Sequence, residues 1–263
     1  MKILLTGHRG FIGQNMFKSL QEDGHNVDGF EWGEELPDIG DYELVMHMGA
    51  ISSTAEKDVE KVMRQNYDFS TNLIDKCVYY NVPVQFSSSG SVYGRGEVFN
   101  ETATVFPMSP YAWSKYLVEK YCRKYTDAKI QFLRYFNVYS SEGESESHKI
   151  GQCSPHYKFR KQAENNKKIE LFVHPKYRTS SRDFIDVMEV IDLQKKLMKS
   201  NSYGIFNIGT GKSKSFEQVA IEISQQYQVD IEEIPMPEDI AGYIQWYTCA
   251  DMTKTHTAIA KVT

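Results

Sequence analysis

Short apolar runs alternate along the chain with longer stretches whose apolar positions recur every three to four residues. The runs have the length of buried strands, and the longer stretches have the period of amphipathic helices. The predicted strands are Ile3–Thr6, Asn26–Phe30, Leu44–His47, Val84–Phe86 and Ile130–Tyr135. The first predicted helix ends at about Glu22, and Glu56–Tyr80 forms one helix or two. A further helix begins at Pro110, and the last two cover Met188–Met198 and Ser215 to about Tyr227. This alternation predicts an α/β protein with a doubly wound parallel sheet.

Three glycines stand directly behind the first predicted strand and open the first predicted helix. Gly7, Gly10 and Gly13 are spaced by three residues. Such glycines permit a tight turn, close approach of a diphosphate and close packing of the helix on the sheet, with the anion at the helix N-terminus. The sequence therefore predicts a Rossmann-like dinucleotide site at Gly7, Arg9, Gly10, Phe11, Ile12 and Gly13. A glycine-rich turn without a ligand is the alternative.

Glu31 ends the second predicted strand, about 20 residues beyond the glycines, where a carboxylate can accept from the adenosine ribose hydroxyls. A carboxylate at this point disfavours a 2′-phosphate, so the sequence favours NAD over NADP. Arg9, inside the glycine loop, could instead bind that phosphate, and NADP remains the alternative cofactor.

Only residues 32–43 separate Glu31 from the next predicted strand, and they show no helical period. A parallel crossover needs about a dozen residues, usually including a helix. We therefore expect the chain to cross directly, so that one edge strand and its helices are absent after Glu31. The adenine side of the cofactor pocket should then be open.

A tyrosine and a lysine share one face of the helix that Pro110 begins. Ser109 is a suitable cap for that helix, and Tyr111 and Lys115 are four residues apart. A free phenol has a pKa of about 10, and an ammonium held close should lower it and make proton transfer near neutral pH possible. The spacing alone is weak, because the chain repeats it elsewhere, for example at Tyr116 and Lys120.

The neighbouring motifs make the prediction for Tyr111 and Lys115 more specific. A serine run, Ser87 to Ser91, follows the fourth predicted strand, and the carboxyl ends of strands in an open parallel sheet are where ligands bind. A serine hydroxyl, the tyrosine and the lysine thus come from successive βα units beside the predicted cofactor. We therefore predict Ser89, Tyr111 and Lys115 as catalytic residues.

Composition narrows the class of protein further. The chain has 263 residues, a net charge of -5 and no basic block, so we expect no nucleic-acid partner. No apolar run approaches the ~18 residues of a membrane helix. The four cysteines are scattered without metal-type spacing, which predicts free thiols, no metal site and a soluble protein of the cytoplasm.

These motifs together resemble the extended short-chain dehydrogenase/reductase family of nucleotide-sugar epimerases and dehydratases. The matching stretches are Gly7–Gly13, Leu44–Ala50, Phe86–Gly94, Ser109–Lys115, Arg134–Tyr139, Arg182–Ile185 and Phe206–Gly211. Within the family, the ADP-glyceromanno-heptose 6-epimerases look most similar, through Gly49–Glu56, His148-Lys149 and Gly209–Ala220. The dehydratases carry an acidic pair just after the serine run, whereas this chain has no carboxylate at Gly90–Val92, which argues against dehydration.

The resemblance implies transient oxidation and re-reduction of a sugar carbon by NAD, with Lys149 as a second base facing Tyr111. A charge in a polar loop is the alternative for Lys149. The residues implied for NAD are Met48, Gly49, Ala50, Asn66, Ser87, Tyr111, Lys115, Tyr135, Asn137 and Val138. Those implied for the nucleotide sugar are Ser52, Ser53, Ser91, Asn137 and Arg182, with Lys158 and Arg160 as further diphosphate candidates. A helix cap is the alternative for Ser52 and Ser53.

The resemblance also implies a domain plan and an assembly. Residues 1–140, with part of 183–209, would form the NAD-binding domain, and 141–182 with 210–263 a smaller substrate lobe. Relatives are commonly homodimers, so we expect a homodimer or a higher homo-oligomer. A UDP- or GDP-sugar 4-epimerase, a reductase of the same family and a non-catalytic NAD-binding protein remain alternative functions.

Overall fold

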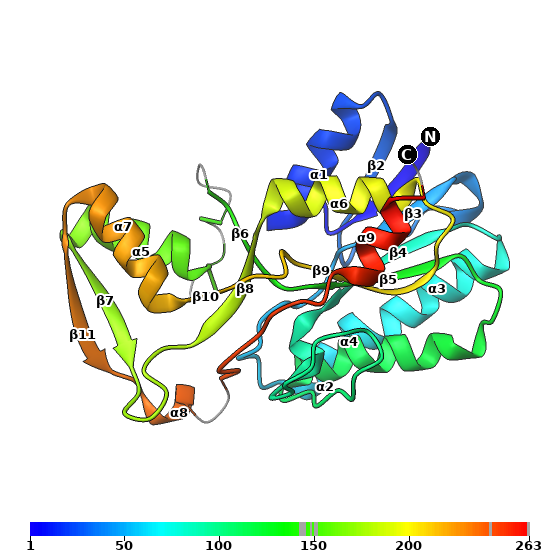
Figure 1. The fold of residues 1–263 in the computed structure, drawn as a ribbon. Coiled ribbons are helices and arrows are strands. Elements are labelled where there is room, and N and C mark those ends of the chain that lie inside the picture. Colours follow the sequence, from blue (N-terminus) through cyan, green and yellow to red (C-terminus); the bar gives the residue numbers. More distant parts are fainter. Residues whose placement is uncertain (142–145, 148, 150–151, 242–243, 262–263) are drawn as a thin grey trace.

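The computed structural model describes residues 1–141, 146–147, 149, 152–241 and 244–261. Its main feature is a six-stranded parallel sheet with the strand order β2-β1-β3-β4-β5-β9 (Figure 1). The strands are β1 (Lys2–Thr6), β2 (Asn26–Phe30), β3 (Leu44–His47), β4 (Val84–Ser89), β5 (Ile130–Tyr135) and β9 (Gly204–Ile208). The predicted serine run is therefore partly in the sheet, because β4 continues through Ser89.

Helices cover both faces of this sheet. On one face, α1 (Phe11–Glu22) and α6 (Val187–Met198) bury Met16, Leu20 and Ile191 against β1 and β3. On the other face, α3 (Phe69–Tyr79) and α4 (Pro110–Tyr121) bury their apolar stripes against β1, β3, β4 and β5. The predicted doubly wound α/β architecture is thus confirmed.

The helix before β4 is continuous but not uniform. It begins with α2 (Val59–Val62), passes through the π-helical turn Met63–Asp68 and continues as α3. Its N-cap is Asp58, whose side chain accepts from the Lys61 N–H. The helix-cap interpretation of Ser52 and Ser53 is therefore wrong.

The edge of the sheet next to β2 has the predicted shortened form. β1 lies between β2 and β3, with Thr6 opposite Phe30 on one side and His47 on the other. Between β2 and β3 the chain forms only turns and a single 3-10 turn, Ile39–Asp41. β2 is therefore the edge strand, and no strand follows it on that side within residues 32–43.

A smaller lobe extends from one side of the molecule (Figure 1). It contains two small sheets, with orders β10-β8-β6 and β11-β7. Its elements are β6 (Asn137–Tyr139), α5 (Pro155–Asn166), β7 (Lys168–Val173), β8 (Ser181–Asp186), β10 (Ser213–Ser215), α7 (Phe216–Tyr227), β11 (Asp230–Pro235) and α8 (Glu238–Ala241). Helices α5 and α7 pack on β7 and β8 around a core that includes Phe159, Leu171 and Val219. Ser215 and Gln218 form the predicted capping box of α7.

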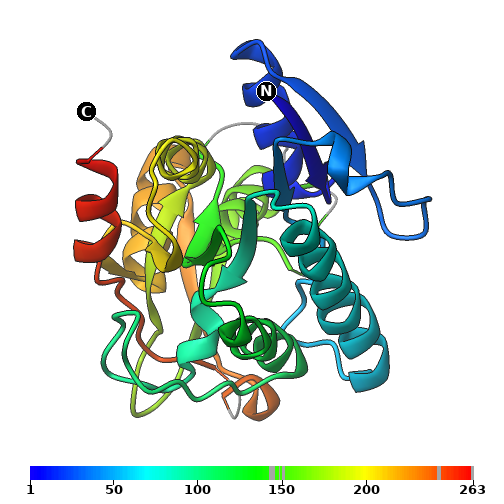
Figure 2. The same ribbon diagram turned by 90° about the vertical axis from the view of Figure 1, so that its right-hand side faces the viewer.

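The last helix lies elsewhere than expected. We expected residues 210–263 in the lobe, but α9 (Thr253–Ile259) packs against α6 and β9 of the main sheet (Figure 2). Its Ala258 is buried in the same cluster as Leu133 and Phe206. A short helix with two buried positions gave no sequence signal for which core it would join.

Two of the compositional expectations can be compared with the structure. The four cysteines are free thiols, as predicted. In the part of the chain that the structure describes, no helix combines the length and the apolarity needed to cross a membrane.

Candidate active site

The glycine loop has the close contacts that a diphosphate site requires. Gly7 has φ +72°, and a Cβ atom there would lie 2.5 Å from the Gly49 Cα atom. A Cβ atom on Gly13 would lie 2.0 Å from the Gly7 carbonyl oxygen. Only glycine fits at these two positions. They let α1 begin directly behind β1, with its N-terminus directed at the carboxyl edge of the sheet.

Glu31 and Arg9 are both held at the end of β2. The Arg9 N–H donates to Glu31 Oε1 at 2.7 Å, and the Arg9 guanidinium lies 3.2 Å from Glu34 Oε1. The Glu31 N–H donates to Glu34 Oε2 at 2.8 Å. Two carboxylates therefore lie at the predicted ribose position, and Arg9 is already paired with one of them. This arrangement favours NAD over NADP, because a 2′-phosphate would meet both negative charges.

A directed chain of hydrogen bonds connects the loop after β3 with the π-helical turn. Thr6 Oγ1 lies 2.6 Å from His47 Nδ1, and His47 Nε2 lies 2.7 Å from Ser70 Oγ. Ser70 uses its one proton to donate to the Asn66 carbonyl oxygen. His47 must then donate from Nε2 and accept at Nδ1 from Thr6, which in turn accepts from the Gly49 N–H at 3.2 Å. Burial, and the nearby Lys115, lower the pKa of His47 to about 3, so it stays neutral.

Asn66, predicted to contact NAD, is buried and bonds within the protein. Its Oδ1 accepts from the Ile51 N–H at 2.8 Å, and its Nδ2 donates to the Ile51 carbonyl at 3.0 Å and to Ser114 Oγ at 3.1 Å. Ser114 lies in α4 and donates to the Tyr111 carbonyl at 2.7 Å. Asn66 therefore positions both the Met48–Ala50 loop and the helix that carries Tyr111.

Ser89, Tyr111 and Lys115 come together at the carboxyl end of β4. Ser109 caps α4 by accepting from the Ala112 N–H at 3.1 Å. Lys115 is buried, with Nζ 4.6 Å from the Phe86 ring centroid and 5.9 Å from that of Tyr111. Ser89 is within hydrogen-bonding reach of the Tyr111 phenol.

The expected lowering of the phenol pKa is wrong for this structure. Burial raises the pKa of Tyr111, and the opposing hydrogen bond with Ser89 is the smaller effect. Burial also lowers the pKa of Lys115 to about 7, so the ammonium charge that should favour the phenolate is itself weakened near neutral pH. In the free protein, Tyr111 is therefore a neutral phenol at neutral pH, and Lys115 is the member of the pair that titrates there.

A buried ion pair that the sequence did not indicate anchors the same helix. Glu119 of α4 accepts from Arg134 of β5 at 3.0 and 2.6 Å, and Ser88 Oγ of β4 donates to it at 2.6 Å. Both charged side chains are almost fully buried. The contact fixes α4, and with it Tyr111, against the two strands beneath it.

Ser87 and Tyr135 also bond to protein groups. Ser87 Oγ donates to Tyr135 Oη at 3.1 Å, and Tyr135 Oη donates to Gln194 Oε1 at 2.5 Å. Their side chains therefore tie β4 and β5 to α6 under the site. Val138 packs with Ile12 of α1 on the neighbouring core clusters, and Asn137 begins β6 where the chain leaves the sheet for the lobe.

The loop after β6 brings Lys149 to the glycine helix. Lys149 Nζ lies 4.8 Å from the centroid of the Phe11 ring, at the first residue of α1. Burial lowers the pKa of Lys149, and the charge of Glu146 opposes this effect. His148 lies outside the described residues. Lys149 thus stands beside the predicted cofactor site rather than in open solvent.

The predicted substrate residues differ in their surroundings. Ser91 Oγ is buried without a hydrogen-bond partner. Arg182 is buried in β8, and burial lowers the pKa of its guanidinium to about 9. Its Nη1 donates to the Ser181 carbonyl at 3.0 Å. Ser53 Oγ accepts from the Ala55 N–H in an exposed turn, and Ser52 is exposed.

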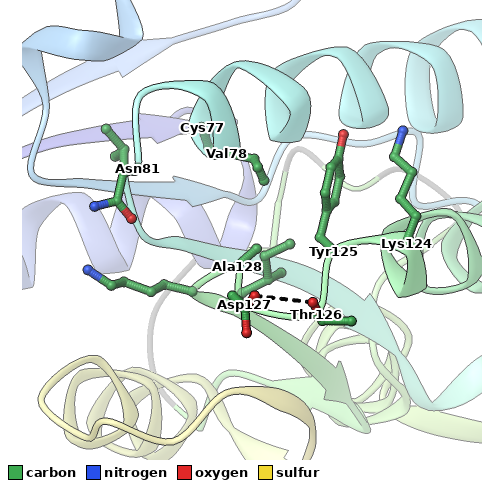
Figure 3. A pocket seen from close by; sticks show the side chains of 11 residues that line it. Cys77, Val78, Asn81, Lys124, Tyr125, Thr126, Asp127 and Ala128 are labelled. Atoms are coloured by element: carbon green, nitrogen blue, oxygen red, sulfur yellow. Dashed lines mark hydrogen bonds between the residues drawn. The ribbon is translucent and has the colours of Figure 1, made fainter.

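A cavity at the other end of the strands lies outside the candidate site. A space of about 360 Å³ opens among the residues at the end of α3, after α4 and at the start of β4 and β5, including Asn81, Lys124 and Asp127 (Figure 3). These are the amino ends of the strands, opposite Ser89, so the cavity is separate from the candidate site. Over the described ranges, no group of three acidic, histidine or cysteine side chains is arranged to hold a metal ion.

Comparison with known proteins identifies the family to which the chain belongs. Residues 3–209 match the model of the NAD dependent epimerase/dehydratase family. The chain therefore belongs to this family, as the motifs suggested, and its cofactor is NAD.

Individual relatives give a finer comparison. The ADP-L-glycero-D-manno-heptose-6-epimerase of Alkalilimnicola ehrlichii is 33% identical over 293 aligned positions, covering 97% of this chain and 91% of that protein. The structure of the Helicobacter pylori ADP-L-glycero-D-manno-heptose-6-epimerase has a TM-score of 0.85 at 23% identity and covers 98% of this chain and 90% of that one. The Thermus thermophilus UDP-glucose 4-epimerase, solved with NAD, has a TM-score of 0.80 at 24% identity, with 98% and 92% coverage. The two structures share the fold with this chain.

Proposed function

We propose that this protein is an NAD-dependent nucleotide-sugar epimerase that acts as an ADP-heptose 6-epimerase does, by transient oxidation and re-reduction of a sugar carbinol carbon. The observation that carries the proposal is the meeting of Ser89, Tyr111 and Lys115 at the carboxyl end of β4. Identity of 33% with an ADP-L-glycero-D-manno-heptose-6-epimerase supports the choice of substrate class.

The mechanism assigns each side chain a proton or a contact. When bound, NAD supplies reversible hydride acceptance at the carbinol carbon. Tyr111 Oη takes the proton of the sugar hydroxyl, while Ser89 Oγ hydrogen-bonds the reacting oxygen. Tyr111 must first lose its own proton to act as the base, and Lys115, with a pKa near 7, would take that proton and carry positive charge beside the phenolate.

Lys149 serves as the second proton-transfer group in this proposal. Exchange of configuration requires re-reduction on the opposite face of the carbonyl intermediate. A protonated group on the far side from Tyr111 can hold the oxygen of the turned intermediate and give it a proton in place of Tyr111. Tyr111 then loses its proton to solvent and Lys149 regains one from solvent. The partly buried Lys149 beside Phe11 supports this role, since burial lowers its pKa and makes proton release easier.

We further propose that the lobe holds the nucleotide half of the substrate. Arg182 would bind the diphosphate, because an anion would relieve the cost of its buried charge. Ser52, Ser53, Ser91 and Asn137 would contact the sugar. In this plan the NAD-binding domain takes residues 1–140, part of 183–209 and α9, and the substrate lobe takes 141–182 and 210 to about 241. Strands β6 and β8 lie at the boundary, because they pair with each other in the small sheet of the lobe.

The decisive experiment combines a substrate panel with one matched pair of variants. Purified protein is incubated with ADP-, GDP-, UDP- and dTDP-sugars, and epimeric products are resolved by NMR spectroscopy. We expect one ADP-sugar to be epimerised, and Tyr111→Phe to lower kcat by about 10²–10⁴-fold. Tyr116→Phe, a tyrosine on another face of the same helix, should retain activity. Activity in Tyr111→Phe equal to the parent would refute the assignment.

A second pair of variants tests the position of the chemistry on the sugar. Lys149→Ala should abolish 6-epimerisation, whereas Lys18→Ala, an exposed lysine of α1, should not. Full activity in Lys149→Ala would indicate a UDP- or GDP-sugar 4-epimerase, which needs one base only. Stoichiometric consumption of reduced nicotinamide would indicate a reductase. Bound NAD with no turnover of any sugar nucleotide would indicate a non-catalytic relative.

Assembly and location complete the proposal. We propose a homodimer or a higher homo-oligomer that works in the cytoplasm. Large exposed aromatic side chains on α3 and α4, Tyr79 and Trp113 among them, support an association surface there. Light scattering on the purified protein tests this, and a monomeric mass at micromolar concentration would contradict it.

A further inference from the structure

The turn after β2 is tightly built. The Glu34 N–H donates to the Glu31 carbonyl at 3.1 Å, the Glu31 N–H donates to Glu34 Oε2 at 2.8 Å, and Gly33 has φ +96°. The pairing of Glu34 with Arg9 ties the turn to the glycine loop. Residue 32 is therefore held in a fixed position next to Glu31, whose carboxylate is the predicted ribose contact.

That residue is a tryptophan whose ring is fixed but almost half exposed. Trp32 is 48% exposed. Its ring meets Phe69 of α3 at a centroid distance of 5.4 Å and an angle of 82°, and Phe69 stacks on Phe30 at 5.5 Å and 4°. A T-shaped contact covers at most one face of the indole. The other face remains available to an aromatic ligand.

The topology puts this free face where adenine must lie. A dinucleotide crosses the carboxyl edge of the sheet, with its diphosphate at the glycine loop and the adenosine ribose at the residue that ends β2. The adenine extends beyond that ribose, toward the edge of the sheet. Residues 32–43 add no strand outside β2. The turn that carries Trp32 is therefore the protein segment that borders the expected adenine position.

We propose that Trp32 is the adenine-binding residue, with its indole stacked on the adenine of bound NAD and supported by Phe69. The stack takes the place of the protein segment that is absent after Glu31. A base on an aromatic side chain is a favourable contact that needs no further hydrogen bond. The exposed side of the cofactor is thereby covered by one side chain instead of a further βα unit.

The test compares ligands that contain adenine with one that lacks it. Nucleotide carried through purification is removed with charcoal, and NAD, ADP-ribose and nicotinamide mononucleotide are titrated into the full chain by calorimetry. Trp32→Ala should weaken NAD and ADP-ribose about tenfold, equivalent to about 1.4 kcal/mol. Nicotinamide mononucleotide should bind as to the parent, and Trp32→Phe should retain most of the NAD affinity.

Trp113→Ala is the matched control. Trp113 is 47% exposed, close to the value for Trp32, and lies two residues from Tyr111 on a helix, so it faces away from the site. This variant should bind NAD as the parent does. Unchanged NAD affinity in Trp32→Ala would overturn the proposal. So would an equal loss of NAD and nicotinamide mononucleotide, which would indicate general damage to the site.

A spectroscopic measurement checks the same contact directly. In a background with Trp113→Phe and Trp246→Phe, Trp32 is the only tryptophan of the chain. Addition of ADP-ribose should quench its fluorescence, because the base covers the indole, and absence of any change at saturation would contradict stacking. Neither measurement uses a sugar substrate, so both remain informative if the proposed epimerisation fails.

Discussion

Replacement of Lys115 by methionine should stabilise the free protein while it abolishes turnover. The lysine is 2% exposed, and its described neighbours include the rings of Phe86 and Tyr111. Burial alone lowers the pKa of Lys115 from 10.5 to about 7. Methionine has a similar length and no charge, so it removes the cost of burying an ammonium.

The size and the pH dependence of this effect follow from the two pKa values. Each pKa unit corresponds to about 1.4 kcal/mol, so the charged side chain costs the folded state about 5 kcal/mol at most. Between pH 7 and 10.5 the unfolded state binds the proton and the folded state does not, and stability therefore rises with pH. Below pH 7 both states are protonated and the full cost applies. About 2 kcal/mol of it should remain at pH 9.

The assay is urea unfolding of the parent and Lys115→Met at pH 6, 7.5 and 9. The free energy of unfolding should be higher for the variant, by the largest margin at pH 6 and by less at pH 9. Lys120→Met, an exposed lysine on the same helix, should show no such margin. A margin that is the same at pH 6 and pH 9, or a variant less stable than the parent at pH 6, would refute the reasoning.

Three further predictions concern the supports of the site. Glu119→Ala should lower the free energy of unfolding by about 3–5 kcal/mol, because Arg134 is left charged and buried; a loss below about 1 kcal/mol in urea unfolding would contradict this. Gly13→Ala should weaken NAD binding measured by calorimetry, since its Cβ atom would overlap the Gly7 carbonyl oxygen at 2.0 Å, and unchanged affinity would count against so close an approach of α1 to the glycine loop. His47 has a folded pKa of about 3 and an ordinary value of 6.5, so the unfolded state binds more protons between these values and stability should fall as pH drops through this window. His47→Phe should flatten that acid limb in thermal unfolding, and an unchanged limb would exclude His47 as its source.

Several parts of the site could be predicted because their signals are local. The glycine loop, the Ser109 cap and the Tyr111–Lys115 face each depend on residues within a few positions of one another. The shortened edge after β2 followed from counting residues, since twelve residues without a helical period leave no length for another strand and its helices. These features depend on segment length and on the spacing of residue types, and both can be read directly from the sequence.

Other supports of the site had no such signal. Glu119 and Arg134 are 15 residues apart, Thr6 and His47 are 41 apart, and neither pair forms a motif. Asn66 was predicted to contact NAD, and its bonds to Ile51 and to Ser114, 48 residues away, make it a positioning residue.

The sequence by itself thus determined the order of strands and helices and the positions of the glycine loop and of the candidate catalytic residues along the chain. Only the tertiary structure decided the protonation of those groups, because burial depends on every element that packs around a side chain. Tyr111 shows this most clearly. The nearby Lys115 led us to expect a lowered phenol pKa, but burial of the Tyr111 side chain raises that pKa instead. The position of α9 has the same cause, because its two buried residues, Thr255 and Ala258, pack against a core that distant parts of the chain form.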